Sequence, residues 1–203
     1  MNFLAHFALS NESQNLTIGS FLGDFVKGNI FGQYNEEIEL GIKLHRAIDA
    51  YTDHHSLTKL SKDRFGPRFR RIGGIMTDIA YDHLLALSWD RFYDEPIDVF
   101  SRRVLEDVLA FKGLPEKTEN LAKIMLRKNS LGNYKKEGFL VDASLNIHKR
   151  LSMRTPMLEA PRIIIKMKKE LNRDFELFYP QLMNFASNWL KTTNKKEIAE
   201  EWK

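Results

Sequence analysis

The amino-acid sequence predicts an all-α, single-domain helical bundle, and three observations support this fold class. Apolar residues recur with the 3.6-residue period of a helix, whereas the alternation typical of a half-buried strand persists nowhere. The chain has 203 residues, which is enough for one substantial core. No internal repeat, low-complexity linker or change of composition divides it, so residues 1–203 are expected to form one domain.

Two segments near the N-terminus carry the first expected helices. His6 lies between Leu4 and Phe7 in an apolar N-terminal helix. Asn35 has the side chain of an N-cap, and the helix that it starts runs to about Asp53. The core-facing stripe of this second helix consists of Ile38, Ile42, His45, Asp49 and Thr52.

Glycine and proline separate the next two helices. A short helix over residues 56–65 ends at the glycine–proline pair 66–67. A longer helix follows the glycine pair 73–74 and runs to about Phe92. One stripe of the longer helix consists of Ile75, Asp78, Asp82, Leu85 and Trp89.

Four further helices are expected in the second half of the chain. The first follows Pro96 and is stopped by Gly113 and Pro115. The others cover about 116–128, about 137–153, and a long stretch that begins near Pro161. Pro180 should kink or split this last helix, and the mostly polar residues 191–203 are expected to fray.

The composition excludes several classes of protein. The chain has no cysteine, which excludes disulfides and thiolate metal sites and agrees with a cytoplasmic location. No apolar run approaches the roughly 20 residues of a membrane span, and the start of the chain lacks the basic segment of a signal peptide. The net charge of +4 allows an acidic partner. We expect neither a nucleic acid nor a membrane as partner.

Histidines and aspartates gather in the first 83 residues, which hold five of the six histidines. His45 with Asp49, and Asp78 with Asp82, are four residues apart, so each pair shares one helix face. A buried carboxylate is costly unless it is paired or coordinated. Because imidazole and carboxylate are the usual ligands of catalytic divalent metals, these pairs predict a metal site. An interhelical hydrogen bond, a helix cap or an arginine pair is the alternative.

Three more residues are candidates for the same site. Asp24 lies in the glycine-rich segment 19–29, whose glycines would allow close backbone approach to a ligand; a helix cap is the alternative for Asp24. His6 is either a ligand or a hydrogen-bonding core residue. His83 lies about 100° further around the helix than Asp82, so both can border one groove.

The residue types favour metal-assisted hydrolysis. There is no Gly-x-Ser-x-Gly motif and no thiol, so a serine or cysteine nucleophile is unsupported. A divalent ion that activates water suits phosphoryl substrates. Carboxylate-rich ligation favours manganese or magnesium over structural zinc. The arginines near the end of the short helix suit a phosphate or carboxylate partner, or form a solvated face; they are Arg64, Arg68, Arg70 and Arg71.

Five motifs in the first half of the chain point to a known family. They are Met-Asn-Phe-Leu-Ala-His (1–6), Gly-Asp-Phe-Val-Lys-Gly-Asn (23–29), Gly-Ile-Lys-Leu-His-Arg-Ala-Ile-Asp (41–49), Thr-Asp-His-His (52–55) and Asp-Ile-Ala-Tyr-Asp-His-Leu-Leu (78–85). In these motifs the chain resembles the acyl carrier protein phosphodiesterases, also called acyl carrier protein hydrolases. The resemblance covers residues 1 to about 92 and continues mainly in the helix pattern. It implies an all-helical fold divergent from the HD-type metal phosphohydrolases, although this chain lacks the His-Asp dipeptide.

The resemblance implies hydrolysis of the phosphodiester that joins 4′-phosphopantetheine to a serine of holo-acyl carrier protein, with Mn2+, or Mg2+ or another divalent cation, as cofactor. Our hypothesis for the metal ligands is Asp24, His45, Asp82, His83 and His6. The candidate catalytic residues are Asp24, His45, Arg46, Asp49 and Asp78. Asp49 would orient His45 or bind a second ion, and Arg46 would hold a phosphate oxygen. The residues proposed to dock the acidic carrier protein are Arg64, Arg68, Arg70 and Arg71.

Two other functions stay open at this stage. A metal phosphohydrolase that acts on a nucleotide or another small phosphate ester would use the same metal core. A non-catalytic binder of an acidic helical protein would keep the fold. A di-iron oxidase is disfavoured because the chain has no Glu-x-x-His pair. The sequence leaves open the number of ions, the cleavage of acylated carrier protein and the oligomeric state.

Overall fold

The computed structural model describes residues 2–151 and 155–201, with side chains up to residue 193. Within these ranges the chain forms ten α-helices and four short 3-10 helices, and no strand is present, which confirms the predicted all-α class. The α-helices are α1 (Phe3–Leu9), α2 (Gln14–Leu22), α3 (Glu36–His54), α4 (Ser56–Arg64), α5 (Gly73–Leu87), α6 (Ile97–Ala110), α7 (Glu116–Arg127), α8 (Glu137–Arg150), α9 (Ala160–Lys166) and α10 (Lys168–Glu201). The 3-10 helices are η1 (Pro67–Phe69), η2 (Trp89–Arg91), η3 (Gly132–Lys135) and η4 (Met157–Glu159).

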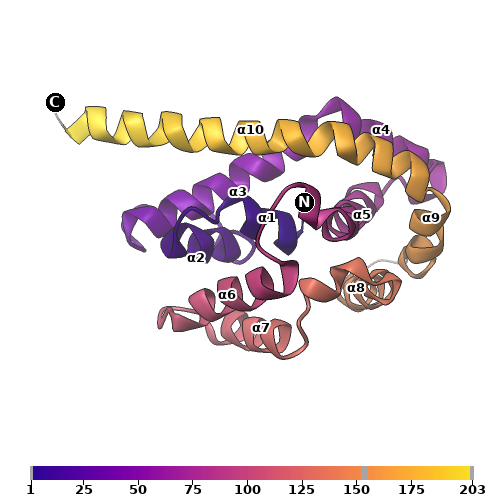
Figure 1. The fold of residues 1–203 in the computed structure, drawn as a ribbon, viewed down its shortest axis with the longest axis horizontal. Helices are drawn as coiled ribbons and strands as arrows, with labels where there is room; N and C mark the ends of the chain where they lie inside the picture. The colour runs from indigo at the N-terminus through magenta and orange to yellow at the C-terminus, as the bar shows by residue number, and fades with distance from the viewer. Residues whose placement is uncertain (1, 152–154, 202–203) are drawn as a thin grey trace.

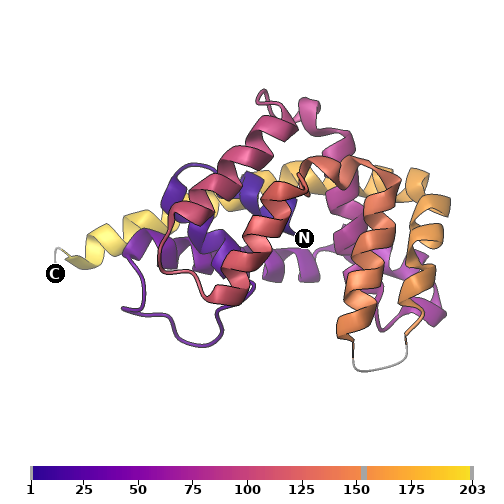
Figure 2. The ribbon, with the colours of Figure 1, turned by 90° about the horizontal axis from the view of Figure 1, so that it is seen from below.

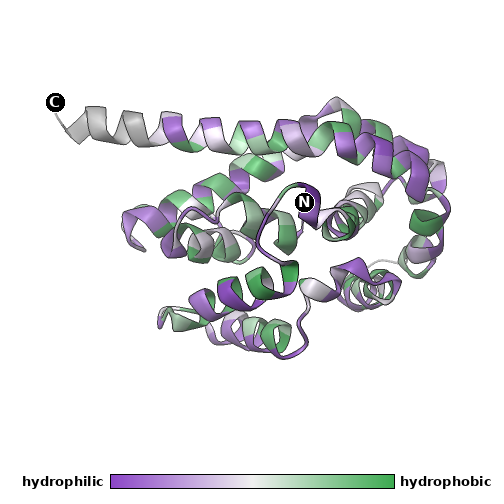
Figure 3. Ribbon diagram, viewed as in Figure 1, coloured by the Kyte–Doolittle hydropathy of each residue, from purple (hydrophilic) through white to green (hydrophobic). Residues whose placement is uncertain are grey.

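The helices pack around α5, which is buried along most of its length and contacts α1, α4, α8 and α10. The long helix α10 runs along one side of the bundle, and the α6–α7 pair lies on the opposite side (Figure 1). α8 and α9 pair at one end, as the view from below also shows (Figure 2). The apolar parts of the helices face one another across the interior (Figure 3). No described helix is both long and apolar enough to cross a membrane.

Polar side chains cap the starts of α1 and α3, the helices that carry His6 and His45. Asn2 accepts a hydrogen bond from the amide of Phe3 at the start of α1. The side chain of Asn35 accepts from the amide of Ile38 at 2.9 Å, which confirms the predicted N-cap of α3. Capping therefore fixes where each of these helices begins.

α2 and α3 approach each other closely because glycines face one another at their crossing. A Cβ atom on Gly19 would lie 2.1 Å from the carbonyl oxygen of Ile38 and 2.8 Å from Cα of Gly41. A Cβ atom on Gly41 would lie 2.4 Å from the carbonyl oxygen of Leu16. A side chain at either position would push the two helices apart.

The structure corrects two helix ends. α5 was predicted to run to about Phe92 but ends at Leu87, where the hydroxyl of Ser88 donates to the carbonyl of Leu84 and η2 follows. The indole of the buried Trp89 then donates to the carbonyl of Glu95, which turns the chain away from the axis of α5.

The last predicted helix is split at Met167 and not at Pro180. The amide of Met167 donates to the carbonyl of Ile163 at the end of α9, and α10 begins at the next residue. Pro180 lies inside the uninterrupted α10. Proline removes one backbone hydrogen bond, but the buried neighbours Phe178 and Tyr179 pack into the core and hold the helix together.

The C-terminal ends of two predicted elements are only partly described. α8 ends at Arg150, and the rest of the expected segment to Met153 falls mostly outside the described residues. α10 continues to Glu201, so the expected fraying of residues 191–203 stays a prediction. The relationship to the HD-type phosphohydrolases also stays a prediction.

Candidate metal centre

Two histidines and one aspartate from α1 and α3 form a compact cluster. Nε2 of His6 lies 3.0 Å from Oδ1 of Asp49, and Nε2 of His45 lies 3.3 Å from Oδ2 of the same carboxylate. The two imidazole rings stack with their centroids 3.8 Å apart. One ligand atom can be taken from each residue so that all three atoms lie within 4.8 Å of one another. No other such group is found in the described part of the chain.

The local sequence explains why these side chains meet. His45 and Asp49 are one turn apart on α3, so they share a face. Gly23, at the end of α2, leaves room for the ring of His45, because a Cβ atom there would lie 2.4 Å from its Cγ. α1, which packs on α2 and α5, brings His6 over the same ring.

Burial and hydrogen bonding set the protonation states of the cluster. Burial, together with the neighbouring His45, lowers the pKa of His6 to about 3, so His6 is neutral at pH 7 and can offer a ring nitrogen to a metal. Burial raises the pKa of Asp49, but the hydrogen bonds from His45 and His6 outweigh burial and hold the pKa well below its usual range. The cluster therefore presents one carboxylate and the neutral ring of His6.

The carboxylates form the open side of the cluster. The side chains of Asp24 and Asp49 are 43% and 46% exposed, whereas that of His45 is 3% exposed. Oδ1 of Asp24 lies 3.9 Å from Nε2 of His45. Partial burial raises the pKa of Asp24 above its ordinary value, although His45 acts in the opposite direction. A substrate can therefore approach from the side of Asp24 and Asp49.

The donor set fits a divalent cation. Ligand atoms that bind one ion at about 2.1 Å lie roughly 3 Å apart, and the separations of 3.0 and 3.3 Å around Asp49 match this spacing. Imidazole nitrogen together with carboxylate oxygen suits several first-row transition metals. His6, His45 and Asp49 thus form a candidate metal site.

Asp82 is placed outside this cluster. It is fully buried on α5, and its two carboxylate oxygens accept hydrogen bonds from the amides of Leu4, at 2.9 Å, and Asn2, at 3.2 Å. Burial raises the pKa of Asp82 to about 7, while these two amides act to lower it. Asp82 therefore holds the start of α1, and its predicted role as a metal ligand stays a prediction.

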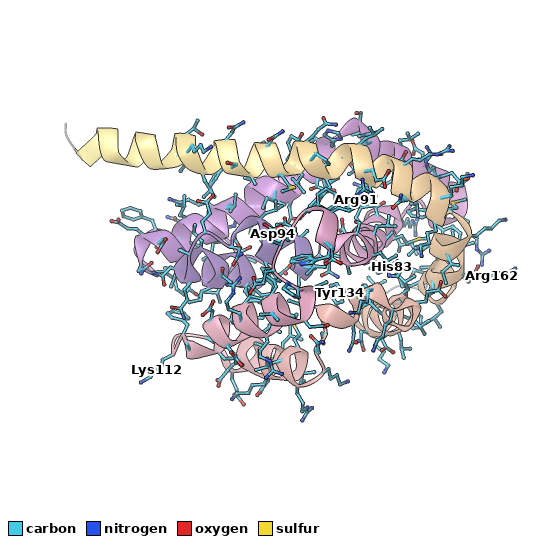
Figure 4. All side chains as sticks on the ribbon, in the orientation of Figure 1. His83, Arg91, Asp94, Lys112, Tyr134 and Arg162 are labelled. Carbon is cyan, nitrogen blue, oxygen red and sulfur yellow. The ribbon has the colours of Figure 1, made fainter. Side chains whose placement is uncertain are left out.

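His83 points away from the cluster as well. Its Nδ1 donates a hydrogen bond of 2.7 Å to the backbone carbonyl of Tyr134 in η3, and the two residues lie near each other between α5 and η3 (Figure 4). Burial lowers the pKa of His83, so the ring is neutral at pH 7. The structure does not bring His83 together with His6 or His45, and a metal role for it stays a prediction.

The remaining candidate catalytic residues occupy two different places. Arg46 donates from Nη1 to the carbonyl of Gly28 and from Nη2 to the carbonyl of Val26, both at 3.0 Å, so its guanidinium holds the loop after α2. Asp78 is half-buried on α5, one turn before Asp82, and lies outside the metal cluster. The predicted phosphate contact of Arg46 and the catalytic role of Asp78 are untested.

The four predicted docking arginines divide into two kinds. Arg64 makes two hydrogen bonds to the carboxylate of the buried Asp174, at 2.7 and 3.1 Å. Arg68 pairs with Glu159 at 2.6 Å. Arg70 and Arg71 are exposed and form no salt bridge with the described residues. Only these last two are free to meet an acidic partner without breaking an existing pair.

Two glycines of the segment 19–29 are needed for packing around the site. Gly19 allows α2 to pack against α3, and Gly23 makes room for His45. Gly28 adopts a left-handed backbone conformation with φ of 76° in the loop held by Arg46. Gly19 and Gly23 thus serve packing around the site, and the close approach of this backbone to a ligand stays a prediction.

Asp49 is more central than the sequence indicated. The sequence predicted that it orients His45 or binds a second ion, and gave no contact with His6. The second contact, to His6, depends on how α1 packs against α3, which no local pattern reveals.

Comparisons with known proteins agree with the motifs in the sequence. A family model described as acyl carrier protein phosphodiesterase matches residues 1–182. Proteins of that name from Photorhabdus laumondii and Pectobacterium atrosepticum are each 33% identical to this chain. The alignments cover 93% and 92% of this chain, and 96% and 97% of the relatives. A relative from Klebsiella pneumoniae is 33% identical over 93% of this chain and 98% of its own length. No solved structure matches the chain.

Proposed function

The chain belongs to the acyl carrier protein phosphodiesterase family, and on that premise we propose that it hydrolyses the phosphodiester between 4′-phosphopantetheine and a serine of holo-acyl carrier protein. The products would be apo-acyl carrier protein and 4′-phosphopantetheine. The observation that carries the proposal is the His6–His45–Asp49 cluster, which lies within the matched residues and is open on its carboxylate side. The proposal includes a cytoplasmic location, which agrees with the absence of cysteine from the sequence.

His6, His45 and Asp49 would hold the divalent ion, for which we propose manganese, with magnesium or another divalent cation as a substitute. Bound there, the ion supplies the Lewis-acid chemistry that phosphodiester hydrolysis needs. Before the ion binds, Asp49 positions both imidazoles, because each of its oxygens lies beside one Nε2 atom. Binding of the ion at these Nε2 atoms would replace the protons that face Asp49. The stacked rings close the inner side of the site, so the substrate phosphate enters from the solvent side.

Asp24 is assigned a proton-transfer role. Its carboxyl lies beside the cluster, is partly exposed and has a raised pKa, so it can hold a proton near neutral pH more readily than an ordinary aspartate. We assign to its Oδ1 the delivery of a proton to the serine oxygen that leaves the phosphorus. The role of metal ligand that the sequence suggested for Asp24 predicts a different result, a loss of Mn2+ affinity in Asp24→Asn.

Intact-mass spectrometry of the carrier protein tests the proposed function. Holo-acyl carrier protein is incubated with the purified enzyme and Mn2+, and a parallel sample contains a chelator. We expect the mass of the phosphopantetheine group to disappear only in the sample with free metal. An unchanged mass with folded, metal-loaded enzyme would contradict the proposal. Turnover of generic small phosphodiesters by that enzyme would then favour a small phosphate ester as substrate, and carrier binding without release would favour a binding role.

A further inference from the structure

The loop between α2 and α3, residues 25–35, presents a large aromatic side chain to solvent. Phe31 is 85% exposed, the largest value among the exposed apolar side chains of the described residues. Phe25, the first residue of the loop, is 38% exposed. Single exposed apolar residues are common in proteins, so exposure alone does not mark a binding site.

What distinguishes Phe31 is that hydrogen bonds hold its loop on both sides. On the N-terminal side of Phe31, the guanidinium of Arg46 donates hydrogen bonds to the carbonyls of Val26 and Gly28. After it, the carboxylate of the buried Glu39 accepts from the amides of Gln33, at 2.9 Å, and Tyr34, at 3.2 Å. The loop is therefore fixed by side chains of α3, the helix that also carries His45 and Asp49.

Within the loop, Asn29 fixes the backbone at Phe31 itself. Its side-chain oxygen accepts a hydrogen bond of 3.0 Å from the amide of Phe31, and its carbonyl accepts one of 2.7 Å from the side chain of Gln33. An aromatic side chain on an ordered loop loses little conformational freedom when a partner covers it. Such anchored aromatic residues contribute most of the binding energy at many protein interfaces.

The loop begins beside the metal cluster. Its first residue follows Asp24 directly in the sequence. The carbonyl of Gly28 accepts a hydrogen bond from Arg46, the residue after His45. Phe31 is the third residue after Gly28, a span of at most about 11 Å. A specific interface covers about 800 Å² on each partner, so a protein whose scissile bond sits at the cluster would also cover this loop.

We propose that Phe31 and the loop 25–35 form a docking surface for the acyl carrier protein, an inference that rests on the proposed function. The loop itself carries no negative charge, because Lys27 is exposed and no residue from 25 to 35 is acidic. Acidic residues lie on the α3 side of Phe31, where Glu36, Glu37 and Glu39 line a hollow beside it. A carrier protein rich in carboxylates would meet no like charge on the loop. In this surface Phe31 supplies the apolar contact. Lys27, which is nearer to Asp24 in the sequence, supplies a positive charge for the carboxylates of the carrier protein.

Steady-state kinetics of Phe31→Ala with holo-acyl carrier protein test the surface. Because the side chain is exposed, the variant should fold normally. We expect KM for the carrier protein to rise at least about fivefold, with kcat within twofold of the wild type. Leu177→Ala, which removes a 62% exposed apolar side chain from α10, is the matched control and should leave both constants unchanged. Equal KM values for Phe31→Ala and the wild type would overturn the inference.

Direct binding separates this inference from the proposed function. Apo-acyl carrier protein, which has no bond to cleave, is titrated onto the immobilised wild type and Phe31→Ala enzymes. Weaker binding to the variant supports the docking surface even if the wild type proves unable to release apo product, in which case the proposed reaction alone fails. Equal binding to both, or no binding to the wild type, overturns the docking surface.

Discussion

Asp49 joins the two halves of the candidate metal site, because each of its oxygens accepts from a different imidazole. An amide in its place keeps one acceptor atom and loses the charge. We therefore expect Asp49→Asn to lower Mn2+ affinity and kcat by about 10- to 100-fold. Isothermal titration with Mn2+ and the carrier-protein assay measure the two effects.

The matched control for Asp49 is Asp53, one turn further along α3. Its carboxylate is exposed and pairs with Lys62 at 2.9 Å. Asp53→Asn should leave metal affinity and turnover unchanged. If both variants lost metal affinity and turnover equally, the negative charge of α3, and not the contact of Asp49 with the histidines, would determine metal binding.

Asp24 is expected to behave differently from Asp49. If it carries a proton and does not bind the ion, Asp24→Asn lowers kcat by about 100-fold or more while Mn2+ affinity changes less than threefold. A drop in metal affinity like that of Asp49→Asn would instead confirm Asp24 as a ligand. The measurements are the titration and assay used for Asp49.

Gly23 tests whether the position of His45 matters. Alanine at this position would place Cβ 2.4 Å from Cγ of His45, so the ring must move. We expect Gly23→Ala to reduce kcat at least about tenfold, because small misplacements of reacting groups are costly. Circular dichroism should report unchanged helix content. Gly138→Ala, where no atom lies within 4 Å of the added Cβ, is the control and should be fully active.

At the scale of the helices, α1 is held in place by a side chain from α5. Asp82 accepts from the amides of Asn2 and Leu4, so the position of His6, two residues further on, depends on a buried carboxylate. The pKa of Asp82 is raised by burial to about 7, from 3.8 for an unperturbed group. Between about pH 4 and 7 the folded protein therefore holds a proton that the unfolded chain has released.

It follows that the contribution of Asp82 to stability falls as pH rises through this window. We expect the difference in free energy of unfolding, wild type minus Asp82→Asn, to decrease by roughly 3 kcal/mol between pH 4.5 and pH 8. Urea denaturation of metal-free proteins measures it. The lowered pKa of His6 makes stability rise with pH. Because His6 is present in both proteins, taking the difference between their free energies of unfolding removes this effect. A difference that stays constant or increases with pH would contradict the raised pKa of Asp82.

Periodicity and caps predicted most elements correctly. α3, α4, α6 and α7 lie where the sequence placed them, because apolar stripes, Asn35 and the glycine and proline stops act locally. The end of α5 was missed because it depends on a contact of the buried Trp89. The break at Met167 was missed because no glycine or proline marks it in the sequence. Pro180 was given too much weight because packing outweighed a local preference.

At the scale of the whole molecule, the candidate site depends on three helices that meet. The sequence indicated His6, His45, Asp49 and Asp24 as residues of one site, and the structure brings them together. The sequence could not show that Asp82 binds the backbone of α1. Helical spacing places Asp82 and His83 on α5, but only the packed fold decides which buried partners satisfy them.

The central claim is that His6, His45 and Asp49 bind one divalent ion. Anomalous diffraction at the manganese absorption edge, from crystals grown with Mn2+, tests it most directly. We predict a peak within bonding distance of Nε2 of His6, Nε2 of His45 and the carboxylate of Asp49. A peak at Asp82 and His83 with none between the stacked rings and Asp49 would contradict it.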